Sequence, residues 1–323
     1  MRRAATSTSV RPLIVTNRGD HTADFLVREF ERRQVPFLRL NTEDFPSDVI
    51  LRWSSDGDHE LRSAGHAYPL SEFPSVWYRR PIGPRQPKGR PGVSEWAVRE
   101  SEEALRGLWR SHRALWVNHP DANHRAEFKQ EQLLRARDLG LEIPETLVTN
   151  SGEEARAFAT SVPAGVVCKP LRLGRLLHRG EEKLFLTSRV SPAQLQDFPE
   201  GGETYLLQAL VEKRADIRVT VVGEHCFAVE IDSQSDPDSL VDWRHGGTAL
   251  HHAVHQLPDQ ISRLCVELCA GYGLCFGAID LALRPDGGYT FFEVNPNGQW
   301  AWIEQLTGLP LSSALADLLL SPC

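Results

Sequence analysis

The sequence predicts a mixed α/β protein with more than one domain. At 323 residues it is longer than one hydrophobic core usually supports, and it has room for two or three domains. It begins with the patterns of a strand, a helix and a second strand, which is the order of a parallel α/β unit. Its last part instead contains β-rich runs joined by short turns, which indicates antiparallel hairpins.

The first region covers residues 12–117 and follows a short basic tail, residues 1–11, that we expect to be disordered. Apolar periodicity and turn residues divide this region into elements. They are a strand over 13–16, a helix over 23–33, a strand over 35–40, a hairpin over 49–53 and 59–62, a strand ending at 81 and a helix over 94–112.

Two further regions follow, a central one over 118–204 and a C-terminal one over 205–323. For the central region the patterns predict a helix over 125–139, a strand over 146–149, a helix capped by Ser151, a strand over 166–170 and a strand over 184–187. For the C-terminal region they predict strands over 204–211, 217–222 and 225–231, a helix over 260–271, a hairpin over 276–295 and helices over 299–307 and 312–320.

Composition excludes several classes of function. The 36 Lys and Arg against 43 Asp and Glu give a net charge of −7, which argues against general nucleic-acid binding. No apolar run reaches the length of a membrane span, and the N-terminus lacks a signal-peptide core. The six cysteines contain no CxxC pair, so we expect reduced thiols. We therefore interpret the chain as a cytoplasmic protein.

The stretch FGAIDLALRPDGGYTFFEVNPNGQW, residues 276–300, predicts a metal site. Residues 285–288 have turn composition, and a symmetric loop there places Asp280 directly across from Glu293 in an antiparallel hairpin. Opposed like charges repel, so a cation is expected between them. The period of a strand returns Asn295 to the face of Glu293. This all-oxygen set suits Mg²⁺, and the alternative is a solvated polar face without an ion.

Two lysines and two arginines are further candidates for binding an anion. Lys169 ends an apolar strand, where a buried ammonium needs an anion such as a phosphate. Lys129 lies in an amphipathic helix, where an ordinary solvated lysine is the simpler interpretation. Arg218 faces away from its apolar strand neighbours, and Arg244 lies next to a glycine-containing loop. Guanidinium groups bind phosphate in a bidentate fork, but each arginine alone could equally form a structural salt bridge.

Other motifs carry less. His251 and His255 would share a face if that segment were helical, but without a third ligand we interpret the neighbouring histidines, His252 included, as solvated or hydrogen-bonded. Trp300 and Trp302 are interpreted as packing residues. No GxxxxGK[ST], GxGxxG or GxSxG motif occurs, so a bound nucleotide would have to be held by lysines and a metal on strands.

The phrases VWYRRP, EFKQEQLLRARDLGLEIPETLVTN, VCKP, LLQALVEK, IRVTVVG, DWR, GAIDLAL and FFEVNPNGQWAWIEQLTGLPLSSALADLL together span residues 76 to the C-terminus. In their wording and order the sequence resembles the ATP-grasp ligases. Among these it is most similar to the peptide maturases that make graspetides, the microviridin-type ester and lactam synthetases. The resemblance implies a three-domain ATP-grasp fold with ATP between the central and C-terminal domains.

The resemblance also implies roles for individual residues. Lys129 and Lys169 would contact the phosphates, and Asp280, Glu293 and Asn295 would hold two Mg²⁺ ions. The nucleotide-binding residues would further include, at the adenine, the backbone near Gln208, Ala209 and Val211, and, at the ribose, Asp216. The catalytic residues would be Arg218 and Arg244, which would steady the γ-phosphate and the acyl phosphate formed from it.

The implied reaction is an ATP-dependent ligation on a ribosomal precursor peptide that has a leader and a core. Asp or Glu side chains of the core would be joined to Ser or Thr hydroxyls, or to a Lys amine. Two alternatives stay open, a ligase that adds amino acids to a carboxylate and an inactive peptide-binding scaffold. The sequence does not determine the precursor, ester versus amide chemistry, the general base, or the oligomeric state, for which a homodimer is one option.

One segment departs from the family pattern. LRLGRLLHRGEEK, residues 171–183, has only Gly174 and Gly180 where many ATP-grasp enzymes carry a glycine-rich loop. It is rich in arginine instead, which suggests a surface for an acidic peptide.

Overall fold

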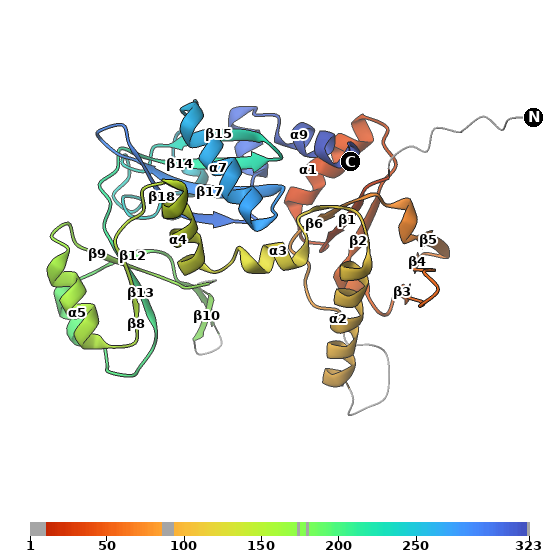
Figure 1. The fold of residues 1–323 in the computed structure, drawn as a ribbon, viewed down its shortest axis with the longest axis horizontal. Helices are drawn as coiled ribbons and strands as arrows, with labels where there is room; N and C mark the ends of the chain where they lie inside the picture. Colours follow the sequence, from red (N-terminus) through yellow and green to blue (C-terminus); the bar gives the residue numbers. More distant parts are fainter. Residues whose placement is uncertain (1–10, 86–93, 173–174, 179–180, 322–323) are drawn as a thin grey trace, which may run out of the picture.

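The computed structural model describes residues 11–85, 94–172, 175–178 and 181–321. Its elements gather around separate sheets that lie side by side in one elongated molecule (Figure 1). The N-terminal elements, in red and orange, lie at one end, and the green central elements lie at the other. The blue C-terminal elements lie between them. Most of the predicted tail, residues 1–10, is outside the described residues.

The N-terminal region is built on a parallel four-stranded sheet in the order β2-β1-β6-β7. Its elements are β1 (Leu13–Thr16), α1 (His21–Arg32), β2 (Leu38–Asn41), β6 (Ser75–Tyr78), α2 (Ser94–Ser111) and β7 (Leu115–Val117). Ile14 and Trp77 pack with α1 on one face, whereas Leu13 and Val15 pack with the α2 side on the other. The predicted parallel α/β unit is confirmed.

A small antiparallel sheet follows β2. The predicted hairpin is confirmed as β3 (Val49–Arg52) and β4 (Glu60–Ser63), and a third strand, β5 (His66–Pro69), which the sequence pattern missed, pairs with β4.

The central region holds an antiparallel sheet in the order β12-β9-β13-β8. Its elements are β8 (Thr146–Thr149), α5 (Gly152–Ser161), β9 (Val166–Lys169), β12 (Ser188–Val190), α6 (Pro192–Gln196) and β13 (Tyr205–Ala209), with a separate hairpin of β10 (Arg175–His178) and β11 (Glu181–Leu184). Strand β13 begins just after the expected domain boundary at 204 and pairs within this sheet. The domain ranges themselves stay a prediction.

The strand predicted over 184–187 is wrong. Strand β11 ends at Leu184 and β12 begins at Ser188, so the residues between them form a connection. The N–H of Thr187 donates to the carboxylate of Asp242 at 3.1 Å rather than to a neighbouring strand. Phe185 in this connection is 44 % exposed, so the apolar run there marks neither a paired strand nor a continuous buried segment.

The C-terminal region contains the longest strands and forms an antiparallel sheet in the order β16-β15-β14-β17-β18. Its elements are β14 (Ala215–Val222), β15 (His225–Ile231), β16 (His252–His255), α7 (Asp259–Tyr272), β17 (Phe276–Leu283), β18 (Tyr289–Asn295), α8 (Ala301–Thr307) and α9 (Leu311–Leu320). Helix α7 covers one face, and α9 lies beside α1 of the N-terminal region (Figure 1).

One helix prediction needs correction. The helix expected over 125–139 is two helices, α3 (Pro120–Arg125) and α4 (Lys129–Leu139). The helix is interrupted between them because the side-chain amide of Gln132 donates to the carbonyl of Ala126. The same side chain also hydrogen-bonds the backbone N–H and C=O of Val294 on β18. Lys129 is thereby the first residue of α4. His252–His255 form strand β16, so positions 251 and 255 share no helical face, in keeping with the rejection of a metal site there.

Two minor interpretations hold. His255 is hydrogen-bonded, to Glu230 at 2.9 Å and to Tyr289 at 2.8 Å. Trp300 is 1 % exposed within the core. In the described part of the chain, no helix is long and apolar enough to cross a membrane.

Candidate active site

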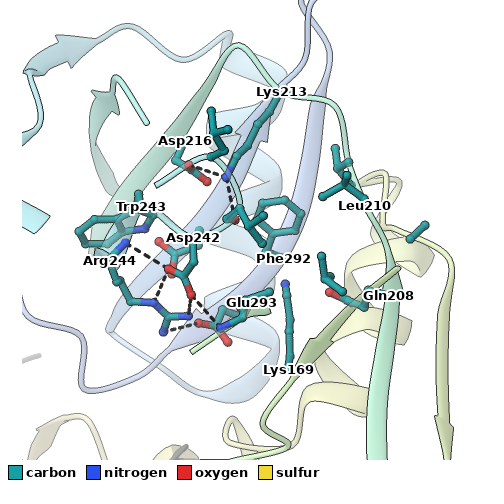
Figure 2. Close-up of a pocket in the computed structure, with 17 residues that line it drawn as sticks. Lys169, Gln208, Leu210, Lys213, Asp216, Asp242, Trp243, Arg244, Phe292 and Glu293 are labelled. Atoms are coloured by element: carbon teal, nitrogen blue, oxygen red, sulfur yellow. Dashed lines mark hydrogen bonds and ion pairs between the residues drawn. The ribbon is translucent and has the colours of Figure 1, made fainter. Parts of the chain in front are cut away.

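A cleft lies between the central and C-terminal sheets (Figure 2). Its lining comes from the ends of β9 and β13, from β14, β17 and β18, and from the loop between β15 and β16. Eight predicted site residues line it, namely Lys169, Gln208, Ala209, Val211, Asp216, Arg244, Asp280 and Glu293. Lys129 and Arg218 join it through ion pairs, whereas Asn295 is outside its lining. Residues far apart in the sequence are thus brought together at one place.

The predicted pairing of Asp280 with Glu293 and the turn within 285–288 are confirmed, but the predicted symmetric register of the loop is wrong. Next to the turn, Leu283 pairs with Tyr289, whereas the symmetric register would pair it with Thr290. The N–H of Arg284 donates to the carbonyl of Gly288. The register then shifts next to Asp280, where β18 carries an extra residue. This bulge restores the pairing that a symmetric loop would have given.

Each of the two carboxylates is paired with a basic side chain. Arg218 is the cross-strand neighbour of Asp280 on β14, and its Nη1 lies 2.9 Å from both carboxylate oxygens. Lys129 Nζ lies 2.8 Å from Glu293 Oε2, and Arg244 Nη1 lies 3.8 Å from Glu293 Oε1. The expected cationic neutralisation is therefore supplied by side chains in the protein alone.

The two carboxylates differ in their pKa. Burial raises the pKa of Asp280, and the Arg218 charge only partly opposes it. Burial also acts on Glu293, but the attraction of Lys129, Arg244 and Lys169 outweighs it and lowers the pKa of Glu293 to about 2. Glu293 is thus a carboxylate at neutral pH and is available as a metal ligand.

The donor set fits Mg²⁺. Asp280 and Glu293 offer carboxylate oxygens from directly opposed positions, and Asn295 follows Glu293 on the same face of β18. The Asn295 Oδ1 accepts from the N–H of Asn297 at 2.9 Å, which leaves a second lone pair on that oxygen. A hard divalent cation prefers such oxygens, so these three residues could hold it.

Lys169 differs from the other cations of the cleft. It makes no ion pair with any residue that the structure describes, and its Nζ instead lies 4.4 Å from the ring centre of Phe292. Burial lowers the pKa of Lys169 to about 8, and the charge of Glu293 only partly opposes this. An incoming anion would satisfy this ammonium.

The residues that the resemblance assigns to the nucleotide base lie where β13 leaves the central sheet. The N–H of Ala209 donates to Glu145 and that of Leu210 donates to Gly165. In the described residues, the backbone N–H and C=O of Val211 form no hydrogen bond, so they are available to the edge of a base. Gln208 donates through its amide to Thr146 at 2.9 Å.

Sequence reasoning missed Asp242 and Lys213. Asp242 holds Arg244 through two hydrogen bonds of 2.7 and 2.6 Å, which fixes the guanidinium towards the cleft. Lys213 Nζ donates to Asp216 at 2.7 Å, and both side chains are almost fully buried. A carboxylate two residues before Arg244 was a usable signal for the first pair, because such neighbours commonly bond. The second pair depends on burial that the sequence does not display.

At Asp216 and Asp242, burial and pairing with a base shift the pKa of the carboxylate in opposite directions. Burial raises the pKa of Asp216 in spite of Lys213. Burial also acts on Asp242, but the hydrogen bond and charge of Arg244 prevail and lower its pKa. Arg244 is held protonated by the same contact, which raises its pKa.

Comparisons with known proteins identify the fold. A family model described as the MvdD pre-ATP grasp domain matches residues 11–124. A RiPP-associated ATP-grasp ligase from Chryseobacterium gregarium, solved with ADP and a leader and core peptide, is 28 % identical, with a TM-score of 0.88 and 96 % of each chain covered. The fold of this protein is therefore the ATP-grasp fold, as the resemblance implied.

Two macrocyclases from Microcystis aeruginosa MRC are similar over almost their whole length. MdnB is 32 % identical with a TM-score of 0.76, and 96 % of this chain covers 99 % of it. MdnC, bound with the precursor peptide MdnA, is 29 % identical with a TM-score of 0.84 and the same coverage. The chain belongs to this family, the ATP-grasp ligases of ribosomal peptide maturation.

More distant curated relatives match only in part. Beta-citrylglutamate synthase B from Danio rerio is 25 % identical over 45 % of this chain and 35 % of its own length. N-acetylaspartylglutamate synthase A from Mus musculus is 25 % identical over 56 % of this chain and 47 % of its own length. The matched stretch thus spans less than half of each of these relatives.

Proposed function

We propose that the protein is an ATP-dependent ligase that closes rings in a ribosomal precursor peptide. It activates Asp or Glu side chains of the peptide core and joins them to Ser or Thr hydroxyls, or to a Lys amine. The observation that carries this proposal is the set of opposed carboxylates, Asp280 and Glu293, in a cleft with five cationic side chains, namely Lys129, Lys169, Lys213, Arg218 and Arg244. The similarity to two macrocyclases along almost the whole chain supports the substrate class.

The chemistry proceeds in two balanced steps. A carboxylate oxygen of the peptide attacks the γ-phosphorus of ATP, which forms an acyl phosphate and releases ADP. A hydroxyl or amine then attacks the acyl carbon, loses its proton, and expels inorganic phosphate. Phosphoryl transfer depends mainly on positioning and on neutralising negative charge. When both reacting groups belong to one bound peptide, ring closure becomes effectively intramolecular.

In this proposal Asp280, Glu293 and Asn295 hold two Mg²⁺ ions, which supply charge neutralisation for the triphosphate. Lys129 and Lys169 contact the phosphates. For Lys169 the support is its partial burial without an ion pair among the described residues, since a phosphate would supply the missing anion.

The base and sugar are assigned to the other end of the cleft. The backbone near Gln208, Ala209 and Val211 reads adenine, because Val211 has unused backbone donor and acceptor groups in the described structure. Asp216 lies near the ribose, where Lys213 keeps its carboxylate in place.

Arg218 and Arg244 steady the γ-phosphate and the acyl phosphate. Their side chains approach from opposite flanking segments, β14 and the loop after β15, and both contact the metal-binding carboxylates. Because Asp242 anchors Arg244 at two atoms, its guanidinium is pre-organised for a developing negative charge.

The expected partner is a precursor peptide with a leader and a core. We place the reaction in the cytoplasm. A homodimer stays one option for the oligomeric state, and light scattering would test it. The arginine-rich segment suggested for an acidic peptide lies partly outside the described residues, so the leader surface is not assigned.

A second candidate is a ligase that adds an amino acid to a carboxylate, which the two curated synthases favour. The products distinguish the two. Cyclisation removes one water per bond formed, whereas addition raises the mass of the acceptor by one residue. An inactive scaffold, the third alternative, would release no ADP with any peptide.

The test uses the small peptide encoded beside this gene, chosen for repeated Thr and Glu in its core. Purified protein, Mg²⁺, ATP and this peptide are incubated, and ADP and peptide mass are followed together. We expect one ADP for each water lost. A mass gain of one residue would favour the second candidate, and a peptide that is unchanged without ADP release would overturn the proposal.

A further inference from the structure

The parallel N-terminal sheet has a crevice that is filled by the protein itself. The order β2-β1-β6-β7 reverses direction between β1 and β6, and in such sheets the carboxyl ends of these two strands are where ligands bind. Here the segment Pro296–Gln299, directly after the predicted metal ligand Asn295, occupies that position. We call residues 296–299 the linker segment.

Three consecutive carbonyls of the linker segment receive hydrogen bonds from this edge of the sheet. Asn118, after β7, donates to Pro296 at 3.1 Å. The two arginines that follow β6 bind the next two carbonyls, Arg80 Nε that of Asn297 at 3.1 Å and Arg79 Nη1 that of Gly298 at 3.0 Å. Each of these carbonyls is thereby bound by a residue that follows a strand of the N-terminal sheet, β6 or β7, within two positions.

The side chain of Gln299 completes the contact. Its Oε1 accepts from Arg79 Nη2 at 2.7 Å and also from the hydroxyl of Thr22 on α1. Arg79 is 1 % exposed, and its Nε lies 3.0 Å from Asp20, which caps α1. Burial lowers the pKa of Arg79 to about 10, with the Asp20 charge opposing it, so the guanidinium stays charged at neutral pH.

On its other side the linker segment touches the candidate active site. Asn297 N–H donates to the Asn295 side chain at 2.9 Å. A Cβ atom on Gly298 would lie 2.6 Å from Arg218 Nη2, so the bare backbone packs against the guanidinium that holds Asp280. Arg79 and Arg218 thus face each other across a single residue.

From these contacts we propose that Arg79, Asn118 and Gln299 are positioning residues for the metal and phosphate site. The N-terminal sheet binds the linker segment as an internal ligand and thereby fixes Asn295 and the Arg218–Asp280 pair. This inference rests on the proposed function, because it assigns the N-terminal region a role in the same site. The crevice serves the reaction without itself holding nucleotide.

The test compares two substitutions at Gln299. Leu matches its size but removes the acceptor for Arg79 and Thr22, whereas Glu keeps an oxygen for both. Binding of Mn²⁺ in the presence of AMPPNP is measured by electron paramagnetic resonance, which does not depend on turnover. We expect Gln299→Leu to weaken Mn²⁺ affinity about tenfold, as the loss of a charged hydrogen bond predicts, and Gln299→Glu to restore it to within about threefold.

Arg33→Gln is the matched control. Arg33 also joins the N-terminal and C-terminal regions, through Asp317 and Ser313 on α9, but it lies outside the linker segment. We expect it to lower the melting temperature while Mn²⁺ affinity stays within twofold of the parent.

The outcomes separate the two proposals. If Gln299→Leu is folded and binds Mn²⁺ as the parent does, the positioning role is wrong. Equal weakening by Arg33→Gln and Gln299→Leu would also overturn it, because domain contact alone would then explain the effect. If the parent itself binds no Mn²⁺ with AMPPNP, the proposed function fails first. Should Gln299→Leu not fold, Thr22→Val, which keeps the size of the side chain but removes its hydroxyl donor to Gln299, gives a milder form of the same comparison.

Discussion

The two sheets that face each other across the cleft hold their charges in different ways. On the C-terminal side, the acids of the cleft are all paired with bases: Asp280 with Arg218, Asp216 with Lys213, and Glu293 with Lys129 of helix α4, which packs against β18. On the central side, Lys169 has no ion pair with any described residue and rests over a ring that belongs to the C-terminal sheet. The charges of the C-terminal sheet are therefore neutralised by side chains before a ligand binds, whereas the charge of Lys169 on the central sheet is not.

This difference between paired and unpaired charges indicates how the cleft would attract and position a nucleotide. The attraction within each pair offsets part of the cost of burying its charges, and the partners rearrange when a metal binds. The lone ammonium of Lys169 carries a standing desolvation cost that an anion relieves. The central sheet thus supplies the attraction for phosphate, and the C-terminal sheet supplies the fixed geometry.

The largest effect is expected on the paired side. Replacing both carboxylates, Asp280→Asn with Glu293→Gln, should lower ADP release with peptide by about a thousandfold or more, because the metal loses its charged ligands. Glu230→Gln on β15, whose partner His255 is outside the cleft lining, is the control and should stay near the parent. Unchanged binding of magnesium and AMPPNP by the double variant would contradict the assignment.

The next largest effect is on the free energy of unfolding, which we expect to change in opposite directions in two lysine variants. Lys213→Met leaves Asp216 buried without its partner and should lower the free energy of unfolding by about 3–5 kcal/mol. Lys169→Met removes an unpaired ammonium and should raise it by roughly 1 kcal/mol while nucleotide affinity falls. Urea titrations without nucleotide check both. The comparison between the two sheets would be broken if both variants lost stability equally.

A third effect is a pH dependence that belongs to the central sheet alone. Because the pKa of Lys169 is about 8 and the phosphate favours the ammonium, AMPPNP affinity should fall about tenfold per pH unit between pH 8 and 10 and should be flat below this range. Lys169→Arg stays charged, so the ratio of parent to variant affinity isolates this group. A constant ratio from pH 7 to 9.5 would exclude the lowered pKa.

The lowered pKa of Lys169 also makes the free energy of unfolding depend on pH. The unfolded lysine binds a proton up to about pH 10.4, whereas folded Lys169 releases it near pH 8. The unfolded state therefore binds more protons between these values, and the destabilising contribution of Lys169 is present below pH 8 and disappears as the pH rises.

The smallest effect concerns the ring that joins the two sheets. Phe292→Leu keeps an apolar side chain but removes the aromatic face under Lys169, at a cost of about 0.5–1 kcal/mol. We expect a two- to fivefold loss of AMPPNP affinity, measured by calorimetry. The loss should disappear in a Lys169→Met background, and its persistence there would show that Phe292 acts through packing.

The hairpin was predictable because its information is local. Turn composition and alternation located Asp280 opposite Glu293, although the symmetric loop was wrong and a bulge beside Asp280 restored the register. The pairing of Arg218 with Asp280 joins β14 and β17, which are separated by two further strands and a helix, and no short-range pattern encodes that register. The sequence thus located the carboxylates but not what neutralises them.

Tertiary contacts also explain the missed positions. Helix α4 begins at Lys129 only because Gln132 bonds the backbone of Ala126 and Val294, and the second of these lies more than a hundred residues away. Asp242 comes from an irregular loop without periodicity. The contact between Arg79 and the linker segment links regions that sequence reasoning had treated as separate domains.

The central claim is that the opposed carboxylates of the C-terminal sheet coordinate a divalent ion while Lys169 binds the triphosphate. Crystals grown with Mn²⁺ and AMPPNP test it most directly through an anomalous difference map. A Mn²⁺ peak bound by Asp280 and Glu293, with Lys169 Nζ in hydrogen-bonding distance of a phosphate oxygen, is the predicted result. Ordered AMPPNP with no peak at these two carboxylates would contradict it.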